Sequence, residues 1–281
     1  MQYQWYPGHM TKAKRMMQED IKLVDLCLEL VDARIPFSSR NPDIDELAKG
    51  KARLIILNKS DLSDPKSNEL WVDFYRQKGF ETLLLDSRNR SRFKDVNKAI
   101  DSACAKKKAR DQKKGIINRP VRAMVVGIPN VGKSTFINSI ANKACTKTGN
   151  KPGVTKGKQW VRLNKSVELL DTPGILWPKF EDEKTGMNLA FIGSINDDIL
   201  DENELAFSLI EFLKDKYPQI IENRYNVEEK DDTLVILDNI ARSRGCLKKC
   251  NETDVLKASR IVLDEFRSGK LGKITLEEPQ E

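Results

Sequence analysis

One short pattern near the middle of the chain most constrains its fold. Residues 127–134 read Gly-Ile-Pro-Asn-Val-Gly-Lys-Ser, which is the spacing of a phosphate-binding P-loop. An apolar run precedes the pattern and a helix-length stretch at 134–142 follows it, as the motif requires. In such a loop backbone N–H groups cradle phosphates, Lys133 reaches the β/γ oxygens, and the Ser134 hydroxyl binds Mg²⁺. The other predicted contacts in this loop are Asn130, Val131, Gly132 and Thr135.

The apolar runs in the first part of the chain predict a parallel sheet. They lie at residues 26–31, 53–57, 82–85, 124–126 and 167–170. Near-continuous apolar runs of this length are typical of buried parallel strands. Helix-length stretches such as 67–79 and 134–142 lie between them. We therefore predict an α/β domain with a mostly parallel sheet flanked by helices.

The last third of the sequence has a different pattern. Leu205, Leu209 and Leu213 recur every four residues, and residues 233–244 and 254–268 are each followed by a glycine suited to end a helix. We predict two domains: residues 1–177 form the P-loop domain and residues 178–281 form a small all-α domain.

A second phosphate-side motif follows the last apolar run. In Asp171-Thr172-Pro173-Gly174 the carboxylate is suited to hold Mg²⁺ through water, and the Gly174 N–H to meet the γ-phosphate. Thr155, in residues 152–157, is the candidate second hydroxyl on Mg²⁺. An ordinary flexible loop is the alternative interpretation of that segment.

Two further motifs predict which base is bound. In Asn58-Lys59-Ser60-Asp61, Asp61 is suited to accept from guanine N1–H and the 2-amino group, which adenine lacks. Asn58 would contact the N7 edge and the Lys59 stem would cover the base. Asp86 and Ser87 offer a backbone amide for guanine O6. Together with the P-loop and residues 171–174, these motifs indicate a GTPase rather than an ATPase.

The order of the motifs is unusual. Ordinary small GTPases have the P-loop first and the base-binding motifs last, whereas here residues 58–61 and 86–88 precede the P-loop. We therefore predict a circularly permuted domain, whose new termini lie in a tolerant surface loop. The segment after Gly174 then leads into the helical region, which offers a route for coupling nucleotide state to that region.

The ordered motifs, with Trp5-Tyr6-Pro7-Gly8-His9-Met10 and Asp32-Ala33-Arg34-Ile35-Pro36, resemble those of the YlqF-type ribosome biogenesis GTPase A family. The similarity spans essentially the whole chain. It implies a GTPase that acts late in assembly of the large (50S) ribosomal subunit in bacteria. It also implies that the particle stimulates hydrolysis, and we expect hydrolysis to be coupled to release from the particle.

The residue that positions the attacking water is a separate question. Many GTPases have a glutamine just after the DxxG motif, but this chain has Ile175, which cannot orient water. The resemblance implies that His9, the single histidine of the chain, performs this role. The alternative is an ordinary loop histidine, since the residue type suits both.

Asn130 has a second possible role. P-loop GTPases with asparagine at this position resemble a potassium-dependent class, in which K⁺ sits among the phosphates. The Asn130 side-chain oxygen is a suitable hard, neutral ligand for K⁺, and the alternative is a residue merely tolerated in the loop. The expected cofactors are therefore Mg²⁺ and, as an activator, K⁺.

Charge distribution points to a polyanionic partner. Residues 1–175 carry 34 basic and 19 acidic side chains, whereas residues 176–281 carry 15 and 23. Basic residues crowd the stretches at 12–15, 106–114 and 143–165. Such runs are often only solvated surface, but an excess around the switch segments favours phosphate contacts with rRNA. Whether the basic cluster at 242–249 touches RNA stays open.

Composition excludes several other classes of protein. No apolar run reaches membrane-spanning length, and the five cysteines are scattered, as in reduced cytoplasmic proteins. We expect a cytoplasmic protein that binds GTP and GDP and is monomeric off the ribosome. Two alternatives are a GTPase of tRNA modification or cofactor assembly, and a GTP-dependent RNA-binding scaffold with little hydrolysis.

Overall fold

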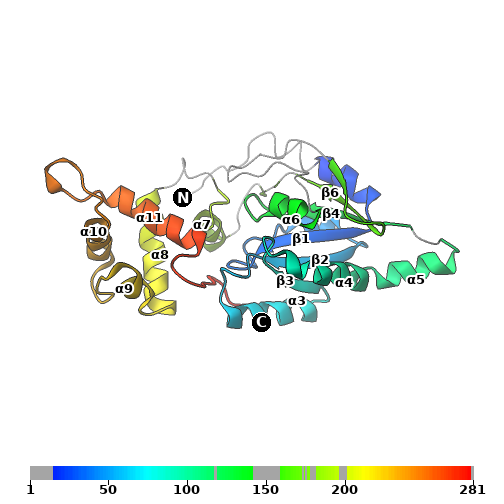
Figure 1. Cartoon of the computed structure of the whole chain (residues 1–281), viewed down its shortest axis with the longest axis horizontal. Coiled ribbons are helices and arrows are strands. Elements are labelled where there is room, and N and C mark those ends of the chain that lie inside the picture. The colour runs from blue at the N-terminus through cyan, green and yellow to red at the C-terminus, as the bar shows by residue number, and fades with distance from the viewer. Residues whose placement is uncertain are drawn as a thin grey trace. The chain divides into compact units, whose positions relative to one another are not determined.

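The computed structural model describes residues 15–116, 119–141, 159–172, 174, 176–177, 182–195 and 201–279. The chain divides into two compact units. The sheet unit runs to Glu183 and takes in the segment from Thr275 onward, and the helical unit is Lys184–Ile274 (Figure 1). The division falls six residues beyond the predicted boundary at 177/178. Residues 275–279, assigned from sequence to the helical domain, instead belong to the sheet unit.

The sheet unit is an α/β fold, as predicted. Its elements are η1 (Ile21–Leu23), β1 (Leu26–Asp32), α2 (Asp43–Leu47), β2 (Ala52–Asn58), α3 (Pro65–Gln77), β3 (Glu81–Leu85), η2 (Arg90–Arg92), α4 (Phe93–Ala103), α5 (Ala105–Lys113), β4 (Val121–Val126), α6 (Lys133–Ile140), β5 (Gln159–Arg162) and β6 (Val167–Asp171).

The strands form one six-stranded sheet in the order β3-β2-β1-β4-β6-β5. Every pairing is parallel except that of β5 with β6, which is antiparallel and closes one edge. β1 is buried along its whole length, as expected for an inner strand of a parallel sheet covered on both faces. β5 was not predicted from the sequence.

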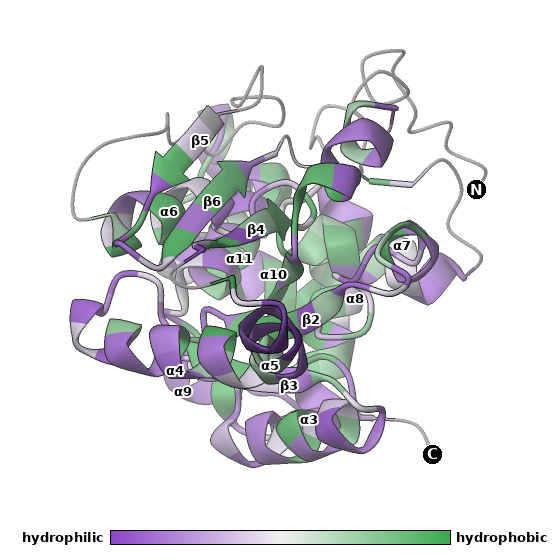
Figure 2. Ribbon diagram, turned by 90° about the vertical axis from the view of Figure 1, so that its right-hand side faces the viewer, coloured by the Kyte–Doolittle hydropathy of each residue, from purple (hydrophilic) through white to green (hydrophobic). Residues whose placement is uncertain are grey.

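Aromatic packing fixes α3 against the sheet. Trp71 and Tyr75 are buried on this helix and pack against Val31, Ile55 and Leu57 of β1 and β2. The helix begins where the Asp64 carboxylate accepts hydrogen bonds from the N–H groups of residues 66 and 67, and proline occupies its first turn. In contrast, α5 has no buried residue and is mostly hydrophilic (Figure 2).

The helical unit is a bundle built on α8. Its elements are α7 (Glu183–Phe191), α8 (Glu202–Lys216), α9 (Ile220–Tyr225), α10 (Thr233–Ser243), η4 (Lys249–Asn251) and α11 (Val255–Ser268). α9, α10 and α11 each contact α8. The last two α-helices end as predicted: Gly245 and Gly269 adopt positive φ angles of +65° and +78°. Among the described residues, no helix is long and apolar enough to cross a membrane.

Candidate functional site

The topology of the sheet brings the predicted motifs to one edge. β1, β2, β3, β4 and β6 all run parallel, so their carboxyl ends lie together. Ligands of open α/β sheets bind outside these ends. The loops that follow these strands carry, in order, residues 32–34, 58–61, 86–88, 127–134 and 171–174.

The P-loop connects β4 to α6 through a tight backbone turn. Gly132 precedes the helix at φ +99°, and a Cβ there would stand 2.5 Å from Nδ2 of Asn58. Lys133 is buried, and its Nζ donates to the carbonyl oxygens of Gly127 at 2.8 Å and Ile128 at 2.7 Å. Burial lowers the pKa of Lys133 to about 8, partly offset by the nearby Asp171 carboxylate. The loop thus presents a helix N-terminus and a buried cation, which suits phosphate.

Asp171 ends β6 and is fully buried. Neither of its carboxylate oxygens accepts a hydrogen bond of ordinary geometry from a described residue. Burial raises the pKa of Asp171 to about 6, although the charge of Lys133 opposes the rise. A buried carboxylate of this kind is costly unless a cation joins it. Asp171 and the half-buried Ser134 therefore fit the hard, oxygen-seeking Mg²⁺.

Gly174 lies closely against the P-loop. A Cβ at this position would stand 2.8 Å from Lys133 Nζ and 2.9 Å from the backbone N of Pro129. A larger residue would therefore crowd the buried lysine. The structure places Gly174 beside Lys133; the contact of the Gly174 N–H with the γ-phosphate stays a prediction.

Asn58 connects the P-loop with the two loops that are predicted to bind the base. Its Nδ2 donates to the carbonyl oxygen of Val131 at 2.7 Å. Its Oδ1 accepts from the Ser87 N–H at 3.1 Å and the Ser87 hydroxyl at 2.7 Å. The Ser87 amide, which sequence analysis offered to guanine O6, is thus engaged by Asn58. A contact of the second Asn58 N–H with guanine N7 stays a prediction.

Asp61 has one oxygen paired and one unpaired. Oδ2 is ion-paired with Arg88, which also pairs with Asp86 at 3.1 Å. Oδ1 is buried, and no described residue donates a hydrogen bond to it. A buried acceptor at this position suits the N–H groups on the guanine edge. Sequence reasoning missed Arg88, although its place directly after Asp86 and Ser87 was a local signal.

Behind the loops predicted to bind the base lies a buried ion-pair network that sequence reasoning also missed. Asp32 is fully buried and accepts from the Arg34 guanidinium through two hydrogen bonds of 2.9 Å. It also pairs with Lys59 Nζ at 3.0 Å. Burial alone would raise the pKa of Asp32, but Arg34 and Lys59 hold it well below its usual range. Lys59 Nζ further donates to the carbonyl oxygen of Asn130 at 2.8 Å, which links the network to the P-loop.

The segment from Thr275 onward caps the loop that follows β1. The Glu277 carboxylate accepts from the backbone N–H groups of Phe37 at 2.8 Å and Ser38 at 3.1 Å. The Leu276 N–H donates to the carbonyl oxygen of Arg34 at 2.8 Å. Residues more than 230 positions apart in the chain therefore pack together around the loop after β1, and no local sequence pattern predicts this.

Several predicted site residues have a defined place, and others do not. Asn130 lies in the P-loop with a positive φ of +60°. The Ser60 N–H donates to the Leu85 carbonyl oxygen at 3.2 Å. Thr135 lies in the first turn of α6. His9 and Thr155 lie outside the described residues.

Comparisons with known proteins show the family of the chain. A family described as 50S ribosome-binding GTPase matches residues 122–244. Ribosome biogenesis GTPase A of Bacillus cereus is 45% identical over 282 aligned positions, covering 100% of this chain and 95% of that protein. The Thermotoga maritima protein of the same name is 31% identical, with 99% and 95% covered.

Solved structures extend the similarity to the fold. A GDP-bound structure of TM YlqF covers 95% of this chain and 100% of its own, with a TM-score of 0.69 and 26% identity. GNP-bound YlqF from T. maritima gives a TM-score of 0.67 at 27% identity, covering 96% of this chain and 99% of its own.

Proposed function

The chain belongs to the ribosome biogenesis GTPase A family, and from that premise we propose that it acts on the precursor of the large (50S) ribosomal subunit. It is a GTPase of ribosome biogenesis. The proposed refinement is that the particle stimulates GTP hydrolysis and that hydrolysis releases the protein. The observation that carries this proposal is the junction of the two units. The carboxylate of Asp171 is buried, and neither of its oxygens has a hydrogen-bond partner of ordinary geometry among the described residues. In the sequence, residues 172–183 connect Asp171 to the helical unit.

We propose that the two parts of the site bind the two parts of GTP. Asp61 would accept from the guanine edge through its unpaired buried oxygen. Lys133 would leave the carbonyl oxygens of Gly127 and Ile128 to contact the phosphates. Ser134, Asp171 and Thr155 would hold Mg²⁺, which neutralises charge on the phosphate oxygens when it is bound.

Water positioning and potassium binding complete the proposed mechanism. Because Ile175 is aliphatic, we assign the attacking water to His9. Slow hydrolysis by the free protein would follow if His9 reaches the γ-phosphate only on the particle, as a closing lid does. Asn130 would contribute its side-chain oxygen to a K⁺ site.

The proposed partner is RNA-rich and located in the cytoplasm. The excess of 34 basic over 19 acidic residues in the first 175 positions supports contact with rRNA phosphates. We assign the helical unit to particle binding and expect the free protein to be monomeric.

Turnover measured with and without large-subunit precursors tests the proposal. We expect stimulation by the precursor, loss of about 10²–10⁴-fold of the stimulated rate in His9→Ala, and unchanged GTP affinity. The variant should also remain on the particle in a sucrose gradient. Small-subunit precursors are the matched control. Wild-type turnover that does not respond to large-subunit precursors would contradict the proposal, and unchanged stimulated turnover in His9→Ala would remove only the histidine assignment.

Guanine selection and potassium have separate tests. Asp61→Asn should weaken GTP binding and shift preference towards xanthosine nucleotides, whose 2-oxo group needs a donor. Equal GTP affinity by calorimetry would rule out the role of Asp61.

Hydrolysis should be faster in KCl than in NaCl at equal ionic strength, and Asn130→Ala should abolish the difference. Equal wild-type rates in both salts would refute the potassium site.

The helical unit must be removed with care. Truncation after residue 178 also deletes Glu277 and so uncaps the loop after β1. Replacing residues 184–274 by a flexible linker keeps this contact. We expect that variant to retain GTP affinity and to lose particle binding.

A further inference from the structure

An exposed tryptophan occupies the antiparallel edge strand of the sheet. Trp160 lies on β5, the last strand in the sheet order, and is 40% exposed. Its neighbour Val161 is buried, so the alternation of the strand places Trp160 and Arg162 together on the opposite face. An indole that is 40% exposed on a short edge strand is unusual, because a large apolar side chain is normally buried.

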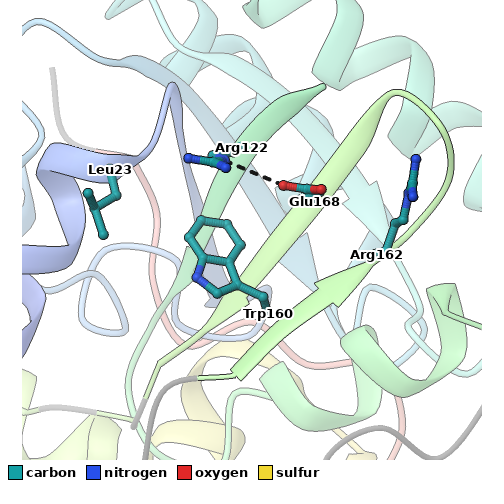
Figure 3. A pocket seen from close by; sticks show the side chains of 5 residues that line it. All are labelled: Leu23, Arg122, Trp160, Arg162 and Glu168. Carbon is teal, nitrogen blue, oxygen red and sulfur yellow. Dashed lines mark hydrogen bonds and ion pairs between the residues drawn. The ribbon is translucent and has the colours of Figure 1, made fainter. Parts of the chain in front are cut away.

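The indole borders a hollow with two arginines. The hollow has a volume of about 240 Å³ and is lined by Leu23, Arg122, Trp160, Arg162 and Glu168. Figure 3 shows Leu23 and Arg122 beside the indole, with Arg162 farther along the same strand. The Arg122 guanidinium carbon stands 5.4 Å from the ring centre of Trp160, and its Nε is 3.4 Å from the Glu168 carboxylate. Arg122 is therefore held over the ring while remaining half exposed.

These features match the chemistry of an unpaired nucleotide. Single-stranded RNA is bound by stacking bases on aromatic rings and by placing cations along the phosphates. Trp160 offers the ring, Leu23 extends the apolar wall, and Arg162 supplies an exposed cation two residues along the strand. A hollow of this volume has room for one base.

We propose that Trp160 is a stacking platform for an unpaired base of RNA, with Arg122 and Arg162 binding the adjoining phosphates. The proposal deepens the proposed function, because the RNA would be rRNA of the precursor particle. It assigns a binding site to the sheet unit in addition to the role given to the helical unit.

Binding of a 12-nucleotide single-stranded adenylate RNA to the full-length protein tests this site. An abasic ribose-phosphate chain of equal length carries the same charge without bases. We expect RNA to quench tryptophan fluorescence in the wild type. Trp160→Phe should keep RNA affinity, because phenylalanine still stacks, but should lose the quench.

Trp160→Ala should weaken RNA binding by about 5- to 100-fold while leaving affinity for the abasic chain unchanged. Arg162→Gln should weaken binding of both chains and reduce the salt dependence. Leu70→Ala, which removes another exposed apolar side chain, on α3 of the sheet unit, is the matched control and should change neither affinity.

The proposal is overturned if Trp160→Ala binds both chains as the wild type does, or if the quench persists in Trp160→Phe. If Trp160→Ala keeps its RNA affinity but no longer binds large-subunit ribosomal proteins, the proposal is also overturned, and Trp160 belongs to a protein interface instead. Because the assay involves neither GTP hydrolysis nor the particle, its result is separate from the test of the proposed function.

Discussion

Asp32 ends β1 and Asp171 ends β6 of the same sheet, and both side chains are fully buried. They differ in whether a cationic side chain pairs with the carboxylate. Asp32, on the proposed base-binding half formed by the loops after β1, β2 and β3, forms ion pairs with Arg34 and Lys59. Asp171, on the proposed phosphate-binding half formed by β4, α6 and β6, accepts no hydrogen bond of ordinary geometry from a described residue. The pKa of Asp32 is accordingly lowered, whereas that of Asp171 is raised to about 6.

The difference shows which buried charges the protein neutralises itself and which one it leaves for a ligand. On the base-binding half the protein neutralises its own buried charges and fixes the loops before nucleotide arrives. On the half proposed to bind the phosphates it leaves a buried anion, for which we propose Mg²⁺ as the partner. Groups that are already oriented stabilise charge without reorganisation, which is the basis of electrostatic catalysis.

The largest expected effect is on the base-binding half. Asp32→Asn leaves Arg34 and Lys59 without their buried counter-charge and should lower the free energy of unfolding by about 3–5 kcal/mol. Asp45→Asn is the matched control: this carboxylate pairs with two arginines but its side chain is 51% exposed, so its loss should cost about 1 kcal/mol or less. Urea unfolding measures both. Equal losses would contradict the comparison.

Asp171→Asn should separate stability from activity. Removing the unpaired buried charge should stabilise the free protein, while GTP hydrolysis should fall by about 10²–10³-fold because charge at the phosphates is no longer balanced. Thermal unfolding and turnover of the same preparation give the two values. Glu168→Gln, on the same strand but half exposed, controls for loss of a carboxylate. A destabilised Asp171→Asn protein would mean that the carboxylate has a partner in the free state.

The pH dependence of stability is the next effect in size. Because folding raises the pKa of Asp171 from 3.8 to about 6, the protonated form is favoured in the folded state. Its contribution is therefore most favourable below pH 4, declines as the pH rises to about 6, and is constant above. The difference in unfolding free energy between wild type and Asp171→Asn should change by about 2–3 kcal/mol across this window. A difference that is flat between pH 4 and 7 would refute the assignment.

The smallest effect concerns Arg88, which pairs with Asp61 and Asp86 at the surface of the base-binding half. Its side chain is 66% exposed, so Arg88→Ala should change stability by less than about 1 kcal/mol. GTP affinity should rise about two- to fivefold, because the guanine edge no longer competes with the guanidinium for Asp61. Arg92→Ala, which removes an exposed pair with Asp95, should leave affinity unchanged. Weaker GTP binding in Arg88→Ala would show that Arg88 assists the base.

Local patterns predicted the framework of the sheet unit well. Strands predicted at 26–31, 53–57 and 167–170 are observed at Leu26–Asp32, Ala52–Asn58 and Val167–Asp171. Inner parallel strands are apolar on both faces, so the signal is strong. β5 was missed because four residues at an open edge, of which only Val161 is buried apolar, carry little periodicity. The basic run at 106–114 was not predicted as a helix, because α5 has no apolar face.

The candidate site was predicted in its motifs and missed in its connections. Parallel topology alone brings Asp61, Lys133 and Asp171 to one edge of the sheet. The ion pair of Asp32 with Lys59 and the cap from Glu277 join segments distant in sequence. Such contacts are set by the packed fold, so no local spacing encodes them.

The contact of Glu277 with residues 37 and 38 has a consequence for how the protein is made. Domains usually fold as they emerge during synthesis, the earlier one first. Here the sheet unit is not complete when its last strand, β6, has been synthesised. Its final segment is translated only after all of the helical unit, Lys184–Ile274. The loop that carries Arg34 therefore cannot contact Glu277 until the whole helical unit has been synthesised. The nascent chain completes the sheet unit only late in translation.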